Sequence, residues 1–175
     1  MADARNDGAR TAAGEASVTL PSGREIEIVR RFAAPRARVF DAWTKADQIA
    51  AWWDPRRRLL AACEVDLRPG GKFRFLPQAS SGEAPPFVGE YLEIAPPARL
   101  VFATPGPSPG LETVGTLTFE EQDGWTTLTI RMSCASRADR DALLRARVDA
   151  GTVQTLASLD AHLRQQARDS AAIDS

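Results

Sequence analysis

The folded part of the chain begins where apolar and polar residues start to alternate. In "REIEIVRRF", Ile26, Ile28 and Phe32 are separated by polar positions, which is the period of a half-buried β-strand. After Pro35 the apolar residues recur every three or four positions as far as Trp53, which is helical spacing. This stretch predicts two short helices with a break between residues 45 and 47.

Short alternating runs then fill the middle of the chain, each separated from the next by a turn. Pro69-Gly70-Gly71 and Asp123-Gly124 are the clearest turns, because glycine tolerates the positive φ that tight hairpins require. Consecutive short strands joined in this way are typical of an antiparallel meander. The sequence from Cys63 to Cys134 predicts six such strands.

The pattern returns to helical spacing after Ser136, which forms a capping box with Asp139. We predict one long amphipathic helix of roughly thirty residues, about 45 Å at 1.5 Å per residue, with Leu143 off its apolar stripe. The sheet is the only surface large enough to bury that stripe, so we expect it to curl around the helix, giving an α+β fold. The predicted stripe consists of Leu144, Val148, Thr152, Thr155, Leu156, Leu159 and Leu163.

The two ends of the chain differ from this folded part. Residues 1–17 contain almost no large apolar side chain, so they cannot bury enough surface to offset the entropy of ordering. We expect a disordered tail at 1–17, a single domain at 18–167 and a short flexible tail at 168–175.

Composition and charge exclude several classes of protein. The formal net charge is −1, which provides no field for recruiting nucleic acid, and no apolar run reaches the ~20 residues that span a bilayer. The N-terminus lacks the apolar region of a secretory signal. Cys63 and Cys134 are too few for a disulfide framework or a zinc site. We therefore expect a cytoplasmic monomer or weak dimer without metal or cofactor.

Several stretches together carry a family resemblance. They are "RFAAPRARVFDAWTKADQIAAWWDP", "VDLRPGGKFRF", "GEYLEIAPPARLVFAT", "LTFEEQDGWTTLTI" and "GTVQTLASLDAHL". In this order they resemble the START-like (SRPBCC) helix-grip superfamily, also called Bet v 1-like, and within it the proteins similar to the activator of the Hsp90 ATPase. The resemblance implies a curved antiparallel sheet around a long C-terminal helix, with two short helices after the first strand.

Members of this fold bind lipids, polyketides or hormones, catalyse cyclisations or assist a chaperone, so the resemblance leaves the function open. We favour binding of a small hydrophobic or amphipathic molecule, lipid- or polyketide-like, between sheet and helix, without catalysis. The alternatives are a protein-interaction module that regulates a chaperone, and a cyclase or hydrolase acting in the same cavity.

One departure from the family bears on that cavity. The family commonly has Gly-Trp in the middle of the last helix, and this chain has Gly151-Thr152. The smaller Thr152 either leaves a larger cavity or is compensated by a neighbour, and Gly151 serves either close packing or room for a ligand. The predicted ligand-binding residues are Trp52, Trp53, Phe73, Phe75, Tyr91, Val148, Gly151, Thr152 and Thr155.

Other conspicuous residues have simpler interpretations. Trp52 and Trp53 point ~100° apart on a helix, so we expect one in the core and the other at the groove. Arg30 shares the inward parity of Ile28 and Phe32, which predicts an inward guanidinium that faces a carboxylate or an anionic ligand group. His162 has no second His or Cys nearby, so we expect neither a metal site nor a catalytic dyad.

Overall fold

The computed structural model describes residues 14–54, 60–78 and 85–173. Eight strands form one antiparallel sheet in the order β1-β2-β8-β7-β6-β5-β4-β3. The strands are β1 (Ser17–Thr19), β2 (Glu25–Phe32), β3 (Leu60–Val65), β4 (Lys72–Pro77), β5 (Phe87–Ala95), β6 (Arg99–Pro105), β7 (Glu112–Gln122) and β8 (Trp125–Cys134). The helices are α1 (Arg36–Thr44), α2 (Ala46–Trp52), α3 (Arg137–Arg145) and α4 (Val148–Ile173).

The sheet confirms the predicted meander and extends it by β2 and β1. Strands β3 to β8 are neighbours in chain order, and β2 joins the far side of β8. Asp123 and Gly124 connect β7 to β8 with φ of 54° and 75°, the left-handed conformations that this two-residue turn requires. Gly70 has φ of 80° in the β3–β4 turn. The predicted helix break is also confirmed, because Lys45 separates α1 from α2.

The predicted ends of the domain need two corrections. Ser17 was assigned to the tail, but it begins β1 and pairs with Val29 of β2. Residues 1–13 lie outside the described residues, so the disordered tail stays a prediction. At the other end, α4 continues to Ile173, past the predicted domain boundary at residue 167.

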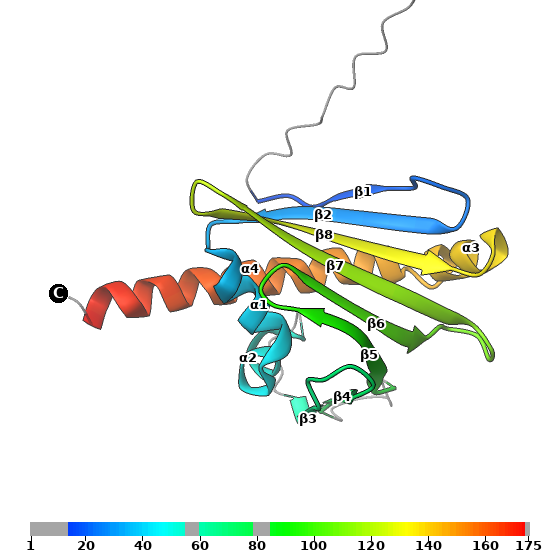
Figure 1. The fold of residues 1–175 in the computed structure, drawn as a ribbon, viewed down its shortest axis with the longest axis horizontal. Helices are drawn as coiled ribbons and strands as arrows, with labels where there is room; N and C mark the ends of the chain where they lie inside the picture. The colour runs from blue at the N-terminus through cyan, green and yellow to red at the C-terminus, as the bar shows by residue number, and fades with distance from the viewer. Residues whose placement is uncertain (1–13, 55–59, 79–84, 174–175) are drawn as a thin grey trace, which may run out of the picture.

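The sheet curves around α4, which crosses its inner face and extends beyond its edge toward the C-terminus (Figure 1). Leu156, Leu159 and Leu163 on this helix are buried and belong to the same core as the inward residues of β2, Ile26 and Ile28. Helices α1 and α2 cover one end of the sheet, where α1 packs on β7 (Figure 1).

The single long helix predicted after Ser136 is wrong. Two helices, α3 and α4, meet at Arg147, whose φ of 56° cannot continue a helix. Ser136 caps α3 as predicted, accepting a hydrogen bond from the Asp139 amide at 3.1 Å. The break changes which side of α3 faces the sheet. Leu143, predicted to be off the stripe, is therefore buried, and Leu144 is only half-buried.

A buried ion pair fastens α4 to β2. As predicted, Arg30 points inward, and its guanidinium Nη2 lies 3.4 Å from Oδ2 of Asp160. Both residues are buried, and Arg164 also contacts Asp160 at 3.0 Å from the next turn of α4. The Arg30 guanidinium lies 5.7 Å from the Phe32 ring centroid. Since desolvation of both charges is costly, the pair fixes where α4 crosses the sheet more than it adds net stability.

The leucines of α4 provide the first test of this packing. Leu156→Ala and Leu159→Ala should each lower the free energy of unfolding by about 2–5 kcal/mol, because each removes a buried leucine side chain from the core. Leu143→Ala should also be costly, whereas exposed Leu20→Ala should change stability by only about 0.5 kcal/mol. Urea denaturation measures all four. A loss at Leu143 no larger than at Leu20 would contradict the assignment of α3 to the core.

The ion pair provides a second test. Asp160→Ala should lower the free energy of unfolding by about 3–5 kcal/mol, because it leaves Arg30 as an uncompensated buried charge. The double variant Arg30→Met, Asp160→Leu should recover most of that loss, since it removes both charges. Thermal and urea unfolding of the single and double variants measure the coupling. Additive losses at the two sites would show that the two side chains do not interact.

Candidate ligand cavity

An aromatic cluster fills the end of the sheet under α1 and α2. Trp52 is 1% exposed, and its indole nitrogen donates to the Ala42 carbonyl at 2.8 Å, which joins α2 to α1. Trp53 is half-buried and packs against Phe75 and Phe87 with ring centroids 4.8 and 4.9 Å away. As the ~100° helical offset predicts, one of the adjacent indoles is core and the other borders an open space.

Four predicted ligand-binding residues, Trp52, Phe73, Phe75 and Tyr91, belong to this aromatic cluster. Phe73, Phe75 and Tyr91 face inward as their strand parity predicts, but with Trp53 and Phe102 they enclose a void of only about 10 Å³. Trp52 is sealed between the helices. None of these four residues lines the larger cavity between the sheet and α4, so their part in ligand binding stays a prediction. Burial also raises the pKa of the Tyr91 hydroxyl well above its ordinary value.

The open space is a cavity of about 520 Å³ between the sheet and α4. Its floor comes from β6 to β8, with Phe102, Leu117 and Ile130 among the lining residues. Its roof is the first part of α4, and Trp43 and Trp53 form the aromatic end wall. Five of the predicted residues line it: Trp53, Val148, Gly151, Thr152 and Thr155.

Gly151 has no packing reason to be glycine. A methyl group built at its Cα would meet no atom within 4 Å, although glycine inside a helix costs about 1 kcal/mol relative to alanine. Close packing against a strand, one of the two interpretations left open by the sequence, is therefore excluded at this position. Gly151 is exposed and lines the cavity, where it contributes no side chain.

The polar groups on the roof are already satisfied. The hydroxyl of Thr152 donates to the Val148 carbonyl at 2.8 Å, and that of Thr155 donates to the Gly151 carbonyl at 3.0 Å. Both side chains therefore use their polar atom within the helix. The cavity is consequently apolar on its helical side as well as on its sheet side.

Sequence reasoning missed several lining residues. Trp43, Phe87, Phe102 and Leu143 line the cavity and were not among the predicted site residues. Phe102 was identifiable as a strand residue, but only the register places it opposite Gly115, where a Cβ would lie 2.8 Å from its ring. Leu143 could not be found while α3 and α4 were taken as one helix.

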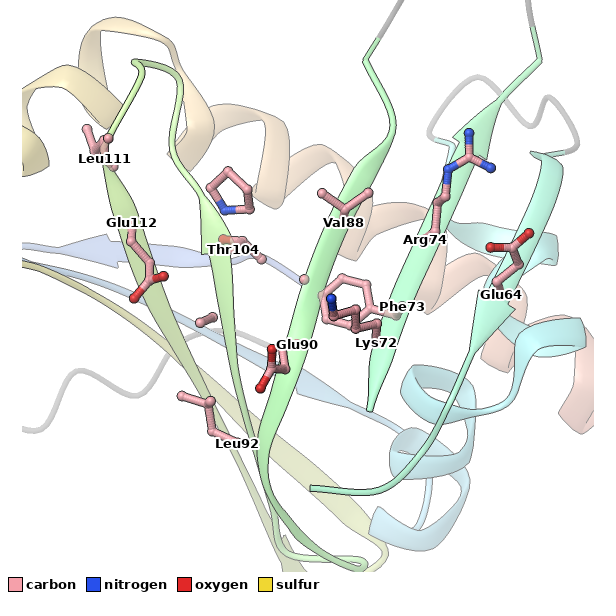
Figure 2. Close-up of a pocket in the computed structure, with 14 residues that line it drawn as sticks. Glu64, Lys72, Phe73, Arg74, Val88, Glu90, Leu92, Thr104, Leu111 and Glu112 are labelled. Carbon is pink, nitrogen blue, oxygen red and sulfur yellow. The ribbon is translucent and has the colours of Figure 1, made fainter. Parts of the chain in front are cut away.

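A larger hollow of about 760 Å³ lies on the outer face of the sheet. Figure 2 shows charged side chains around it from β3, β4, β5 and β7. Lys72 lies directly opposite Glu90, and Arg74 directly opposite Glu64, in the strand register. Opposite charges in such pairs stabilise a solvated face. We interpret this hollow as surface, because it is bordered by charges, whereas ligand pockets are mostly apolar.

The remaining candidates for chemistry have structural roles. His162 Nε2 lies 2.9 Å from Gln48 Oε1, which links α4 to α2, and burial lowers the pKa of the imidazole. Burial raises the pKa of the Cys63 thiol to about 11, so the thiol is protonated and weakly nucleophilic at neutral pH. Among the described residues, no group of three or more His, Cys, Asp or Glu side chains could hold a metal ion.

The curved sheet, the crossing C-terminal helix and the two short helices define a helix-grip protein. The chain belongs to the family described as Activator of Hsp90 ATPase homolog 1-like protein, whose model matches residues 33–164. No curated protein matches the chain. Within the described residues, no helix has both the length and the apolar character needed to cross a bilayer.

Solved structures share this fold. A protein from Rhodobacter sphaeroides has 24% sequence identity and a TM-score of 0.76, over 86% of this chain and 99% of that one. A protein from Chromobacterium violaceum has 27% identity and a TM-score of 0.64, over 80% and 96% of the two chains. An HSP90 activator from Plasmodium falciparum has 24% identity and a TM-score of 0.50, over 63% and 72%.

Substitution of Gly151 tests whether the space at its Cβ position is open or already occupied by packed atoms. Gly151→Ala should raise the free energy of unfolding by about 0.5–1 kcal/mol, because alanine favours the helix and its methyl group meets nothing. Gly89→Ala is the matched control. It should be destabilising, since its Cβ would lie 2.6 Å from the Ala103 carbonyl oxygen. Denaturant titration measures both, and a destabilised Gly151→Ala would mean that the site is already filled.

Proposed function

We propose that this protein binds a small apolar molecule in the cavity between the sheet and α4. The observation that carries the proposal is the 520 Å³ cavity, roofed by a glycine whose side-chain position is empty. A cavity of this size lies within the range of about 300–1,000 Å³ typical of ligand sites.

The aromatic end wall supports the same function. Trp43 and Trp53 line the cavity and meet with ring centroids 6.1 Å apart. Flat aromatic walls present large apolar contact area at little conformational cost. An aromatic or aliphatic ligand would therefore contact both indoles, and binding would change the polarity around them.

A fluorescence titration tests the proposal. Fatty acids, flavonoids and polyketide-like aromatics should be added one at a time while Trp emission and the melting temperature are followed. A ligand should shift or quench the emission saturably, and should stabilise the protein by about 2.7 kcal/mol at a hundredfold excess over Kd. A shift in emission without stabilisation would count as nonspecific contact and against the proposal.

Thr152→Trp tests whether the cavity is where the ligand binds. The indole restores the residue common in the family and should occupy the space near Gly151, so the variant should fold and lose binding. Binding is best measured by calorimetry here, because the new indole adds its own emission. Gln154→Trp is the control, since Gln154 is exposed on the same helix. A folded Thr152→Trp protein that still binds would place the ligand elsewhere.

A second function is supported by the family itself. The family's description refers to activation of the Hsp90 ATPase, and one structure with this fold is an HSP90 activator. This function would use the surface of the domain and would leave the cavity unexplained, which is why we place it second. Stimulation of Hsp90 ATPase activity by the purified protein, unchanged in Thr152→Trp, would favour it over ligand binding.

A further inference from the structure

The wall of the cavity has no ionisable side chain among the described residues that form it. Its members are aromatic, aliphatic, proline, glycine and threonine residues. Two of the threonines, Thr152 and Thr155, direct their hydroxyls to the helix backbone. The cavity therefore offers a bound ion no opposite charge.

Arg30, a buried cation of the core, does not provide the missing positive charge. Arg30 is the buried arginine on the inner face of the sheet, and its guanidinium contacts Asp160, which Arg164 also contacts. None of these three residues lines the cavity. Since Arg30 does not line the cavity, a ligand carboxylate there would remain unpaired.

Two neutral polar groups border the cavity instead. Trp43 and Thr113 both line it and are both buried. The hydroxyl of Thr113 interacts with the Cys134 thiol, and the indole Nε1 of Trp43 has no hydrogen-bond partner in the described part of the chain. Both atoms have almost no exposed surface, so neither presents a charge to a ligand in the cavity.

We propose that the occupant of the cavity is an uncharged molecule, such as a ketone, amide, ester or alcohol with an aromatic or aliphatic body, and not a carboxylate. This inference rests on the proposed function. A volume of about 520 Å³ lies within the range of about 300–1,000 Å³ typical of small-molecule sites. The physical reason for the selectivity is desolvation, because a buried ion without a partner loses its hydration and gains nothing in return.

Ligands of nearly the same shape test whether the charge of a ligand alone changes its affinity. 2-Acetylnaphthalene, 2-naphthamide and 2-naphthoate have nearly the same outline, and at about pH 8 only the naphthoate is charged. In calorimetric titrations of the full chain, the ketone and the amide should both bind at least about tenfold more tightly than the carboxylate. The amide is the important comparison, since it is polar but neutral.

A cation placed in the wall should change this preference. Thr152→Lys adds an ammonium group at a residue that lines the cavity, and it should raise the affinity for 2-naphthoate at least about tenfold without a similar gain for the amide. Gln154→Lys adds the same charge to an exposed position of the same helix and should leave both affinities near those of the parent protein. Circular dichroism and thermal unfolding establish that both variants fold.

The possible results separate this inference from the function on which it rests. Naphthoate binding as tight as that of the ketone and the amide would overturn the inference, while binding in the cavity would still stand. A folded Thr152→Lys protein with no gain for naphthoate would overturn the assignment of the selectivity to this wall. No saturable binding of any of the three, nor of the wider ligand panel, would remove the proposed function and this inference together.

Discussion

The structure depends on the burial of one face of α4. Leu156, Leu159 and Leu163 form a continuous apolar surface on a helix of 26 residues, and the sheet is the only element large enough to cover it. A flat sheet would contact the helix along a line, so the strands must curl to remove more apolar area from water. The meander makes this possible, because each strand from β3 to β8 is hydrogen-bonded to the next strand in sequence and can bend around the helix in succession.

The cavity lies beside the first turns of α4, where the helix carries smaller side chains than in its middle. The leucines hold the middle of α4, whereas its first turns carry Val148, Gly151 and Thr152, which line the cavity. The Arg147 break also redirects the chain, so that α3 provides Leu143 from a different angle. Protein interiors are close-packed, and an apolar space of about 520 Å³ departs from that rule. Such departures are expected at functional sites rather than at random.

The two ends of the domain are held by different forces. At β2, the Arg30–Asp160 pair sets the position of α4 through a charge interaction with little tolerance for displacement. Under α1 and α2, the aromatic rings pack edge to face, as Trp43 and Trp52 do at 5.0 Å and 65°. The aromatic end leaves a void of only about 10 Å³, while its outer member, Trp53, still borders the cavity. The fold is shared with proteins of diverse function, so the properties of this cavity carry the functional argument.

The sequence by itself determined the order of the elements from β2 to β8, the Asp123-Gly124 turn, the break at Lys45 and the inward parity of Arg30, because these follow from local periodicity and backbone preference. It also identified Gly151 and Thr152 as the unusual positions of the last helix. Only the tertiary structure decided that Phe73, Phe75 and Tyr91 fill space while Trp43, Phe87 and Phe102 border it, since parity gives the face of a strand but not the distance to the next layer. It also decided the break at Arg147, because the apolar periodicity runs across residues 144–148 while the requirement to pack α3 and α4 on a curved sheet lies outside any local window.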